Sequence, residues 1–333
     1  MKQQQLIQLV VVRNVSPIHA KLCKRANHMS LGKPKLHLAP REIDKLGERL
    51  REGTATKKDF DTLNEYQATY DHLLIDICRQ VDNSLTLNKF KFLLTGRLKR
   101  TKSIVRKLRR EANRHMCLSQ MGDILGLRVI VASMAEQERV LKSLRGIFRV
   151  ADVKDYRSSG QMYRSLHALV KEEKLIEIQI RTLPQHVWAV ESETFGEKVK
   201  EGTLDAKEAS YLTDLSSACA LLDNGKDCAE NNFPKTPFLT ERMPISGLYS
   251  DLKSKFERIA YVPNHSSNTF VVVYDNEERK ILHNTPFPPK DRETAIKTYQ
   301  RFTQDLSELR FECLIFNSSS SEVLAITHPR FYI

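Results

Sequence analysis

The strongest constraint on the fold is the segment at residues 175–182, LIEIQIRT, in which apolar and polar side chains alternate. Successive side chains of a β-strand point to opposite faces. The three isoleucines are therefore predicted to face a core, and Glu177, Gln179 and Arg181 to lie on the other face. The pattern alone leaves that polar face open between a solvated sheet surface and the floor of an active site.

Helical and extended patterns alternate through the middle of the chain. GLRVIVAS, YRSLHALV and EKLIEIQIRT are typical of strands, whereas MAEQERVLKSLRGIF is typical of a helix. This order predicts an α+β fold, a mixed sheet flanked by helices. We predict a mainly helical region at 1–89, the α+β domain at 90–200, a helical extension and linker at 201–246, and an accessory α/β module at 247–333, read as hairpin, helix and strand.

The composition favours an anionic partner. A net charge of +12 and a pI of about 9.4 suit nucleotides, RNA, DNA or an anionic membrane surface, although solvated lysines alone would give the same balance. The six cysteines are scattered without zinc-site spacing, which predicts reduced thiols and a cytoplasmic protein. The early apolar run LIQLVVV is too short to span a bilayer, so no membrane association is predicted.

Basic residues gather in GRLKRTKSIVRKLRR, where Ser103 and Lys107 are spaced one helical turn apart and Arg97 and Lys99 precede the helix. Cations near a helix N-terminus are unfavourable unless an anion lies between them. The segment is therefore interpreted as either a solvated basic helix or a triphosphate site. The sequence contains no Walker A loop, Rossmann fingerprint, GxSxG elbow or HExxH helix.

Two further segments carry candidate polar groups. In MGDILGLRVIV, Asp123 and Arg128 flank a turn that leads into a strand, and Asp123 alone is interpreted as a cap or a metal ligand. In KDYRSSGQMYRSLHALV, Tyr163 stands at a loop–strand junction, where an exposed ring can stack on a base, and His167 follows on the same face. Basic groups, Glu177 and Asp123 for Mg²⁺, and a stacking tyrosine together indicate a phosphoryl-type transferase without a P-loop.

From about Phe90 to Gly196 the chain resembles the synthetase domain of the RelA/SpoT homologue family, the (p)ppGpp synthetases of the stringent response. The segments GRLKRTKSI, D..G.R, DY......YRSLH and EIQIRT occur in the family's order and approximate spacing. The helical N-terminus and C-terminal hairpin resemble the small branch with a single synthetase domain, and no HD-type hydrolase motif is present. The resemblance implies a nucleotidyltransferase-like fold and a cytosolic enzyme, an ATP:nucleotide 3′-pyrophosphokinase.

The resemblance also implies the reaction and the residues of the donor side. ATP would donate its β,γ-pyrophosphate to the ribose 3′-hydroxyl of GDP or GTP, and AMP would leave. By position in the motifs, Arg97 and Arg128 would sandwich the adenine. Lys99, Ser103 and Lys107 would hold the ATP phosphates.

The remaining motif residues are implied for the metal and the acceptor. Asp123 and Glu177 would hold Mg²⁺, and Glu177 would also assist deprotonation of the acceptor hydroxyl. Tyr163 would stack on the acceptor base. Three further side chains would line that side: His167, Gln179 and Arg181.

One departure from the family leaves the acceptor open. The family's acceptor loop contains an NPK-like stretch and a glycine directly before the tyrosine, whereas here DYRSSGQMYRS is shorter and Met162 precedes Tyr163. The alternatives are a toxin-type pyrophosphokinase acting on the 3′ end of tRNA or on adenine nucleotides, and a catalytically silent nucleotide- or RNA-binding regulator. A homo-oligomer is also left open.

Overall fold

The computed structural model describes residues 38–157, 162, 164–226, 245–260, 268–305 and 310–331. The helical prediction for residues 1–37 and most of the predicted linker after residue 226 lie outside these ranges. Residues Leu36–Ile333 form one compact unit. Within the described ranges, no helix combines the length and apolarity that a bilayer-spanning segment needs.

Three helices precede the sheet in the described residues: α3 (Pro40–Glu52), α4 (Lys57–Ala68) and α5 (Asp71–Leu87). Proline at the first position of α3 and Gly53 in the left-handed conformation after it (φ +79°) define its two ends. Their apolar sides pack into the main core, so these helices form one wall of the domain.

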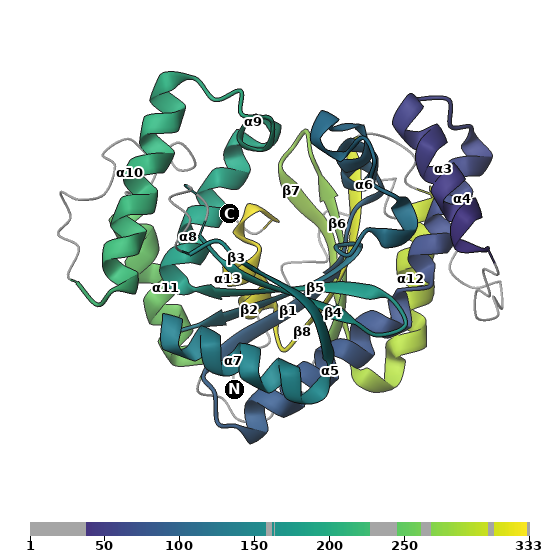
Figure 1. Cartoon of the computed structure of the whole chain (residues 1–333). Coiled ribbons are helices and arrows are strands. Elements are labelled where there is room, and N and C mark those ends of the chain that lie inside the picture. Colours follow the sequence, from purple (N-terminus) through teal and green to yellow (C-terminus); the bar gives the residue numbers. More distant parts are fainter. Residues whose placement is uncertain are drawn as a thin grey trace. The chain divides into compact units, whose positions relative to one another are not determined.

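The sheet follows, with two helices inserted between its strands (Figure 1). The elements of this region run in the order β1 (Phe92–Leu98), α6 (Thr101–Arg109), β2 (Leu125–Val131), α7 (Met134–Ile147), β3 (Arg149–Asp155), β4 (Leu166–Lys171) and β5 (Leu175–Thr182). The pair β2–β5 is parallel, and the other neighbouring pairs in the sheet are antiparallel. The predicted α+β class with a mixed sheet flanked by helices is confirmed.

A second group of helices comes after β5: α8 (Leu183–Ser192), α9 (Glu197–Glu201), α10 (Ala206–Asp223) and α11 (Ile245–Ile259). They cover the opposite face of the sheet from α5 and α7. The alternation along β1 shows the two faces, because Leu94 packs into the core with α5 whereas its neighbour Leu93 packs with α8, α10 and α11. Short 3₁₀ turns complete the described chain: Glu111–Asn113, Leu118–Gln120, Glu193–Phe195, Pro289–Asp291 and Pro329–Phe331.

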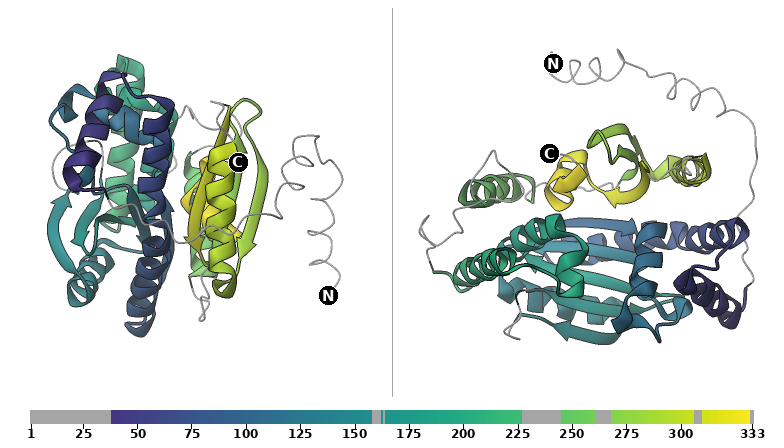
Figure 2. Two further views of the ribbon diagram at one scale, coloured as in Figure 1. Left: turned by 90° about the vertical axis from the view of Figure 1, so that its right-hand side faces the viewer. Right: turned by 90° about the horizontal axis from the view of Figure 1, so that it is seen from above.

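The C-terminal elements extend the same sheet. They are β6 (Asn268–Asp275), β7 (Lys280–Phe287), α12 (Arg292–Asp305), β8 (Phe311–Ser318) and α13 (Ser321–Thr327). The predicted hairpin, helix and strand are present, and β8 pairs with β1 over Thr95–Arg97, giving the strand order β3-β4-β5-β2-β1-β8-β6-β7. Figure 2 shows these yellow and light-green elements against the blue and teal ones. One continuous sheet therefore contains strands from both the predicted α+β domain and the predicted C-terminal module.

Candidate active site

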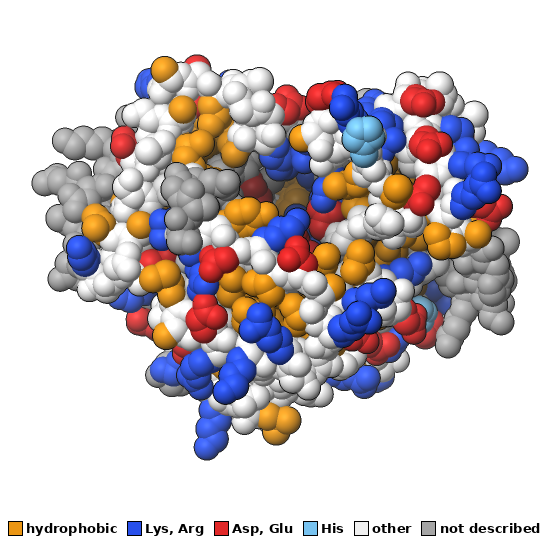
Figure 3. All heavy atoms as spheres, viewed as in Figure 1, with side chains coloured by type: hydrophobic (Ala, Val, Ile, Leu, Met, Phe, Trp, Pro, Cys, Tyr) orange, Lys and Arg blue, Asp and Glu red, His pale blue; other side chains and the backbone are white. Residues whose placement is uncertain are grey.

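Strand register brings residues from three motifs into one row. Arg97 of β1 pairs with Gly126 of β2, and Gly126 in turn pairs with Glu177 of β5. Arg128 pairs with Gln179 two positions further along. A cavity lies over this row, and Figure 3 shows a hollow on this face where basic and acidic side chains gather. Six predicted site residues line the cavity: Arg97, Lys99, Asp123, Arg128, Glu177 and Gln179.

Two lysines converge on Asp123 at one end of the cavity. Lys99 Nζ and Lys107 Nζ each lie 2.8 Å from Asp123 Oδ2. Lys99 directly follows β1, and its backbone N–H donates to the carbonyl of Ile124 over 2.7 Å, so the strand end holds it in place. Ser103 lies one turn before Lys107 on α6, and both residues are partly buried. Two of the three predicted phosphate-binding residues, Lys99 and Lys107, thus share one carboxylate.

The protonation state of Asp123 is decided by these lysines. Burial alone would raise its pKa, but the charges and hydrogen bonds of Lys99 and Lys107 outweigh burial and lower the pKa from 3.8 to about 2. Burial lowers the pKa of Lys99, and Asp123 opposes that shift. The cluster is therefore an ionised acid between two bases, with a net positive charge that suits phosphate groups.

Glu177 stands on the polar face of β5, as the alternation predicts. Ile176, Ile178 and Ile180 are fully buried in the main core, whereas Glu177 and Gln179 are partly exposed on the other face. This finding resolves the ambiguity of LIEIQIRT, because the polar face of β5 lines a cavity. The strand has a dry side and a side that faces the candidate site.

A chain of hydrogen bonds fixes the polar side chains of β5. His167 Nδ1 of β4 lies 3.1 Å from Glu177 Oε1, and Gln179 Nε2 donates to Glu177 Oε2 over 2.9 Å. Arg181 Nη2 donates to Gln179 Oε1 over 2.9 Å. Burial would raise the pKa of Glu177, but the contacts of His167 and Gln179 lower it from 4.5 to about 2 although Asp123 opposes them. Glu177 is therefore a carboxylate at neutral pH.

The two carboxylates fit a magnesium ion. Asp123 Oδ1 is buried and has no hydrogen-bond partner among the described residues, so one hard oxygen is left for a cation. The described chain gathers no cluster of three or more His, Cys, Asp or Glu side chains that could hold a metal. Mg²⁺ is commonly bound by one or two carboxylates together with substrate phosphates and water, so a site with two acids suits it when a nucleotide supplies the remaining oxygens.

Arg128 is a buried residue of the cavity lining, and both terminal nitrogens of its guanidinium group have partners. Nη1 donates to the backbone carbonyl of Thr327, and Nη2 lies 3.6 Å from Glu193 Oε1. The partners come from α13 and from the turn after α8, which are far from β2 in sequence. Arg97, on the neighbouring strand, is less buried and lines the same cavity. Both arginines predicted for the adenine are therefore at one place.

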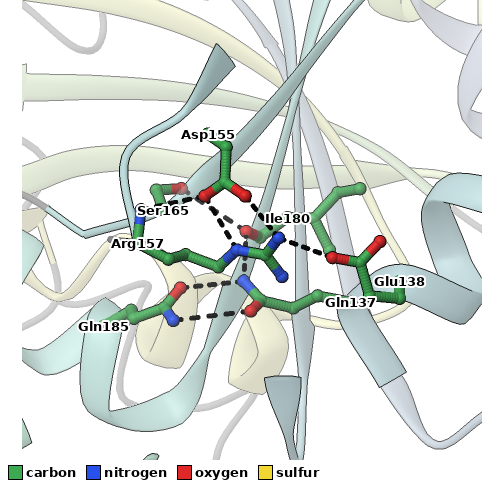
Figure 4. A network of polar contacts seen from close by, with 7 residues as sticks. All are labelled: Gln137, Glu138, Asp155, Arg157, Ser165, Ile180 and Gln185. Carbon is green, nitrogen blue, oxygen red and sulfur yellow. Dashed lines mark hydrogen bonds and ion pairs between the residues drawn. The ribbon is translucent and has the colours of Figure 1, made fainter. Parts of the chain in front are cut away.

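Tyr163, the predicted stacking residue, lies outside the described residues. The stem of its loop is described and is firmly anchored (Figure 4). Arg157 Nη2 donates to Asp155 Oδ2 and to Glu138 Oε1, each over 2.5 Å. Gln137 Nε2 donates to the carbonyl of Ile180 and to Gln185 Oε1, each over 2.8 Å. These contacts tie the loop stem and the end of β5 to α7.

The sequence reasoning missed His328, which lines the cavity from beyond the C-terminal end of α13. It also missed Glu193 and Thr327, the partners of Arg128. None of the three belongs to a pattern with recognisable spacing. Thr327 and His328 reach the site because β8 pairs with β1, which brings α13 over the sheet, whereas Glu193 comes from the turn after α8.

Acid should destabilise the protein partly through Asp123. Its folded pKa of about 2 lies below its ordinary value of 3.8, so its contribution is complete above pH 4 and is lost as the pH falls towards 2. The contribution is on the order of 2 kcal/mol. Urea unfolding in EDTA at pH 4.5 and 2.5 should show a smaller loss of stability in Asp123→Asn than in wild type. Equal losses would contradict the depressed pKa.

Comparison with known proteins identifies the family of the chain. Residues 96–196 match the model described as "Region found in RelA / SpoT proteins". GTP pyrophosphokinase YjbM of Bacillus subtilis (strain 168) is 33% identical over 145 residues, which cover 39% of this chain and 67% of that protein. The chain belongs to the RelA/SpoT family. The predicted family and the prediction of a pyrophosphokinase-type enzyme are confirmed.

Other relatives of this RelA/SpoT protein cover different shares. The guanosine-3′,5′-bis(diphosphate) 3′-pyrophosphohydrolase of Aquifex aeolicus (strain VF5) is 30% identical over 203 residues, 59% of this chain and 27% of that protein. Among solved structures, small alarmone synthetase 1 from Bacillus subtilis is 27% identical and has a TM-score of 0.43, covering 50% of this chain and 94% of that chain. A GTP pyrophosphokinase family protein from Streptococcus pneumoniae is 25% identical, with a TM-score of 0.42, and covers 51% and 92%.

Proposed function

We propose that this protein transfers the β,γ-pyrophosphate of ATP to the ribose 3′-hydroxyl of GDP or GTP. The bond between Pβ and the oxygen that bridges it to Pα breaks, and this oxygen leaves with AMP. A new bond forms between Pβ and the 3′-oxygen, which loses its proton. The observation that carries the proposal is the convergence of Lys99 and Lys107 on Asp123 beside Glu177 in one cavity.

The donor side is built for a polyanion. In our proposal Arg97 and Arg128 hold the adenine between them, and Lys99, Ser103 and Lys107 hold the phosphates. Lysines paired with Asp123 are held in place before the nucleotide arrives, so the phosphates meet fixed charges rather than flexible ones. Positioning and charge neutralisation are what phosphoryl-type transfer needs most.

Asp123 and Glu177 would hold Mg²⁺ in this proposal. The ion would neutralise charge on the transferred phosphates. Because the pKa of each carboxyl group is about 2, both stay ionised at neutral pH and suit a cation. The same low pKa makes Glu177 a weak acceptor for the proton of the 3′-hydroxyl, so metal binding is the role that its environment favours.

The acceptor would lie along the polar face of β5. His167, Gln179 and Arg181 form a hydrogen-bonded row with Glu177, which places donors and acceptors beside the proposed metal. Tyr163 would stack on the acceptor base from the loop before β4. The family relationship supports guanosine as that base, and the named relatives include a GTP pyrophosphokinase.

The acceptor is tested directly with ATP labelled at the β- or γ-phosphate. The protein is incubated with GDP, GTP, an adenine nucleotide or deacylated tRNA, and products are separated. We expect label on the guanosine nucleotides and one AMP released for each product. Label on tRNA alone, or on the adenine nucleotide alone, would move the protein to the corresponding alternative acceptor. No label on any acceptor would support the silent regulator.

Metal removal should stop the transfer. Treatment with EDTA is expected to reduce product formation to background, because two ionised carboxylates would then face the phosphates without a cation between them. Added Mg²⁺ should restore the rate, whereas Ca²⁺, which prefers more ligands at longer distances, should restore little of it. Full activity in EDTA would show that the acids act without a metal.

A further inference from the structure

His328 forms a wall of the cavity at the two arginines. Its side chain is buried, with 6% of the residue exposed, and its ring packs at a tilt on Phe316, 4.8 Å between centroids. Arg97 and Arg128 line the same cavity, and the positive charges of both lower the pKa of the imidazole. A ring from the C-terminal region therefore lies where the proposed function places the base of the donor nucleotide.

Hydrogen bonding fixes which ring nitrogen of His328 carries the proton. Thr327 Oγ1 donates its single proton to the carbonyl of Val323 over 2.8 Å, so it can only accept in its 3.0 Å contact with His328 Nδ1. Nδ1 must then be protonated. Burial, followed by the charges of Arg128 and Arg97, holds the pKa of His328 well below its usual value, so the ring is neutral.

The other nitrogen, Nε2, is consequently a bare acceptor. Among the residues that the structure describes, the hydrogen bond of the His328 ring is made through Nδ1. Adenine presents the N6 amino group as a donor, whereas guanine presents the O6 oxygen, an acceptor, at the equivalent position. An acceptor facing an amino group forms a hydrogen bond, and an acceptor facing an oxygen repels it. The two purines are thus distinguishable by one ring nitrogen.

We propose that His328 is a specificity-determining residue for the donor nucleotide, in which Nε2 accepts a hydrogen bond from the adenine N6 amino group and disfavours guanine. This inference rests on the proposed function, since it takes Arg97 and Arg128 as the site of the donor base. It assigns the C-terminal region a direct part in choosing ATP over GTP as donor.

Thr327 acts as the positioning residue for this recognition. Its hydroxyl sets the tautomer of His328, and its backbone carbonyl accepts from Nη1 of Arg128. Glu193 lies at the other edge of the guanidinium, so Arg128 is held from two sides of the cavity. His186 Nε2 donates to the carbonyl of Ile326 over 2.8 Å, which anchors the end of α13.

The test measures donor binding without acceptor, so that no donor is consumed. ATP and purine riboside triphosphate, which lacks the N6 amino group, are titrated with Mg²⁺ into the full chain. Wild type should bind ATP about tenfold more tightly than the purine analogue. His328→Phe should bind both equally, because phenylalanine keeps the ring and removes the acceptor. His328→Gln, whose amide oxygen can accept, should recover part of the preference. Thermal unfolding checks that each variant is folded.

Thr327 provides the matched pair of variants. Thr327→Val keeps the shape but removes the hydroxyl, so it should reduce the preference for ATP over the purine analogue, whereas Thr327→Ser should keep it. A purely structural role for Thr327 would weaken binding of both donors equally and leave the preference unchanged, which would overturn this part of the inference.

The remaining outcomes separate the inference from the proposed function. Retention of the tenfold preference in His328→Phe overturns the inference, and so does tighter ATP binding in that variant, which would show the ring to be an obstruction. If wild type shows the binding pattern but transfers label to no acceptor, the proposed function fails and the role of His328 stands. If wild type binds neither ATP nor the purine analogue, both the inference and the proposed function are overturned.

Discussion

Replacing Glu177 with glutamine is expected to lower turnover about 1,000-fold while the protein stays folded. The amide keeps the size of the side chain and can still contact His167 and Gln179, but it loses the negative charge that the proposed metal requires. The measurement is the rate of AMP release with ATP and GDP at saturating Mg²⁺, with thermal unfolding as the check on folding.

Glu173→Gln is the matched control for this change. Glu173 is exposed and lies shortly before β5, so its substitution removes the same charge outside the cavity. The turnover of this variant should remain within about twofold of wild type, because substitutions at exposed positions away from a binding site usually have small effects. If Glu177→Gln also stays within that range, Glu177 is neither a metal ligand nor a base in the transfer.

Asp123→Asn should lose both turnover and stability. The loss of turnover should again be about 1,000-fold, because the second proposed metal ligand is gone. Unlike Glu177, Asp123 also neutralises Lys99 and Lys107, so its removal leaves two partly buried ammonium groups without their shared carboxylate. Breaking such a cluster is expected to cost about 2–3 kcal/mol of unfolding free energy, measured by urea denaturation at pH 7.

A second substitution separates the two losses. In Asp123→Asn combined with Lys99→Met, one of the stranded charges is removed, and the methionine fills similar volume. We expect stability to recover by more than half and turnover to remain absent. Recovery of turnover together with stability would show that Asp123 serves the fold alone.

Local patterns predicted most of the elements and the polar face of β5. The alternation in LIEIQIRT follows directly from strand geometry, and the helix at α3 follows from its proline start and glycine end. The family resemblance, carried by the order and spacing of the motifs, predicted that Asp123 and Glu177 belong to one site. The residues did not need to be close in sequence, because β2 and β5 pair in parallel.

The C-terminal contribution to the site could not be predicted in this way. The apolar pattern of β8 predicts a strand but says nothing of which strand it will pair with, and the expectation was a separate accessory module. His328 and Thr327 enter the site only through that pairing. A histidine after a short helix carries no local signal of a purine-binding role, so three-dimensional contact was needed to find it.

The pairing of β1 with β8 has a consequence for how the protein is made. Arg97 of β1 pairs with Phe316 of β8, so β1 is paired on this side only after a strand much later in the sequence has been made. Contacts between such distant residues form late, because closing a long loop costs entropy before any contact is gained. During synthesis the edge of β1 stays open, and the wall that includes His328 is absent, until β8 has left the ribosome. The nascent chain therefore holds an incomplete nucleotide site until both β8 and the following segment with His328 have been synthesised.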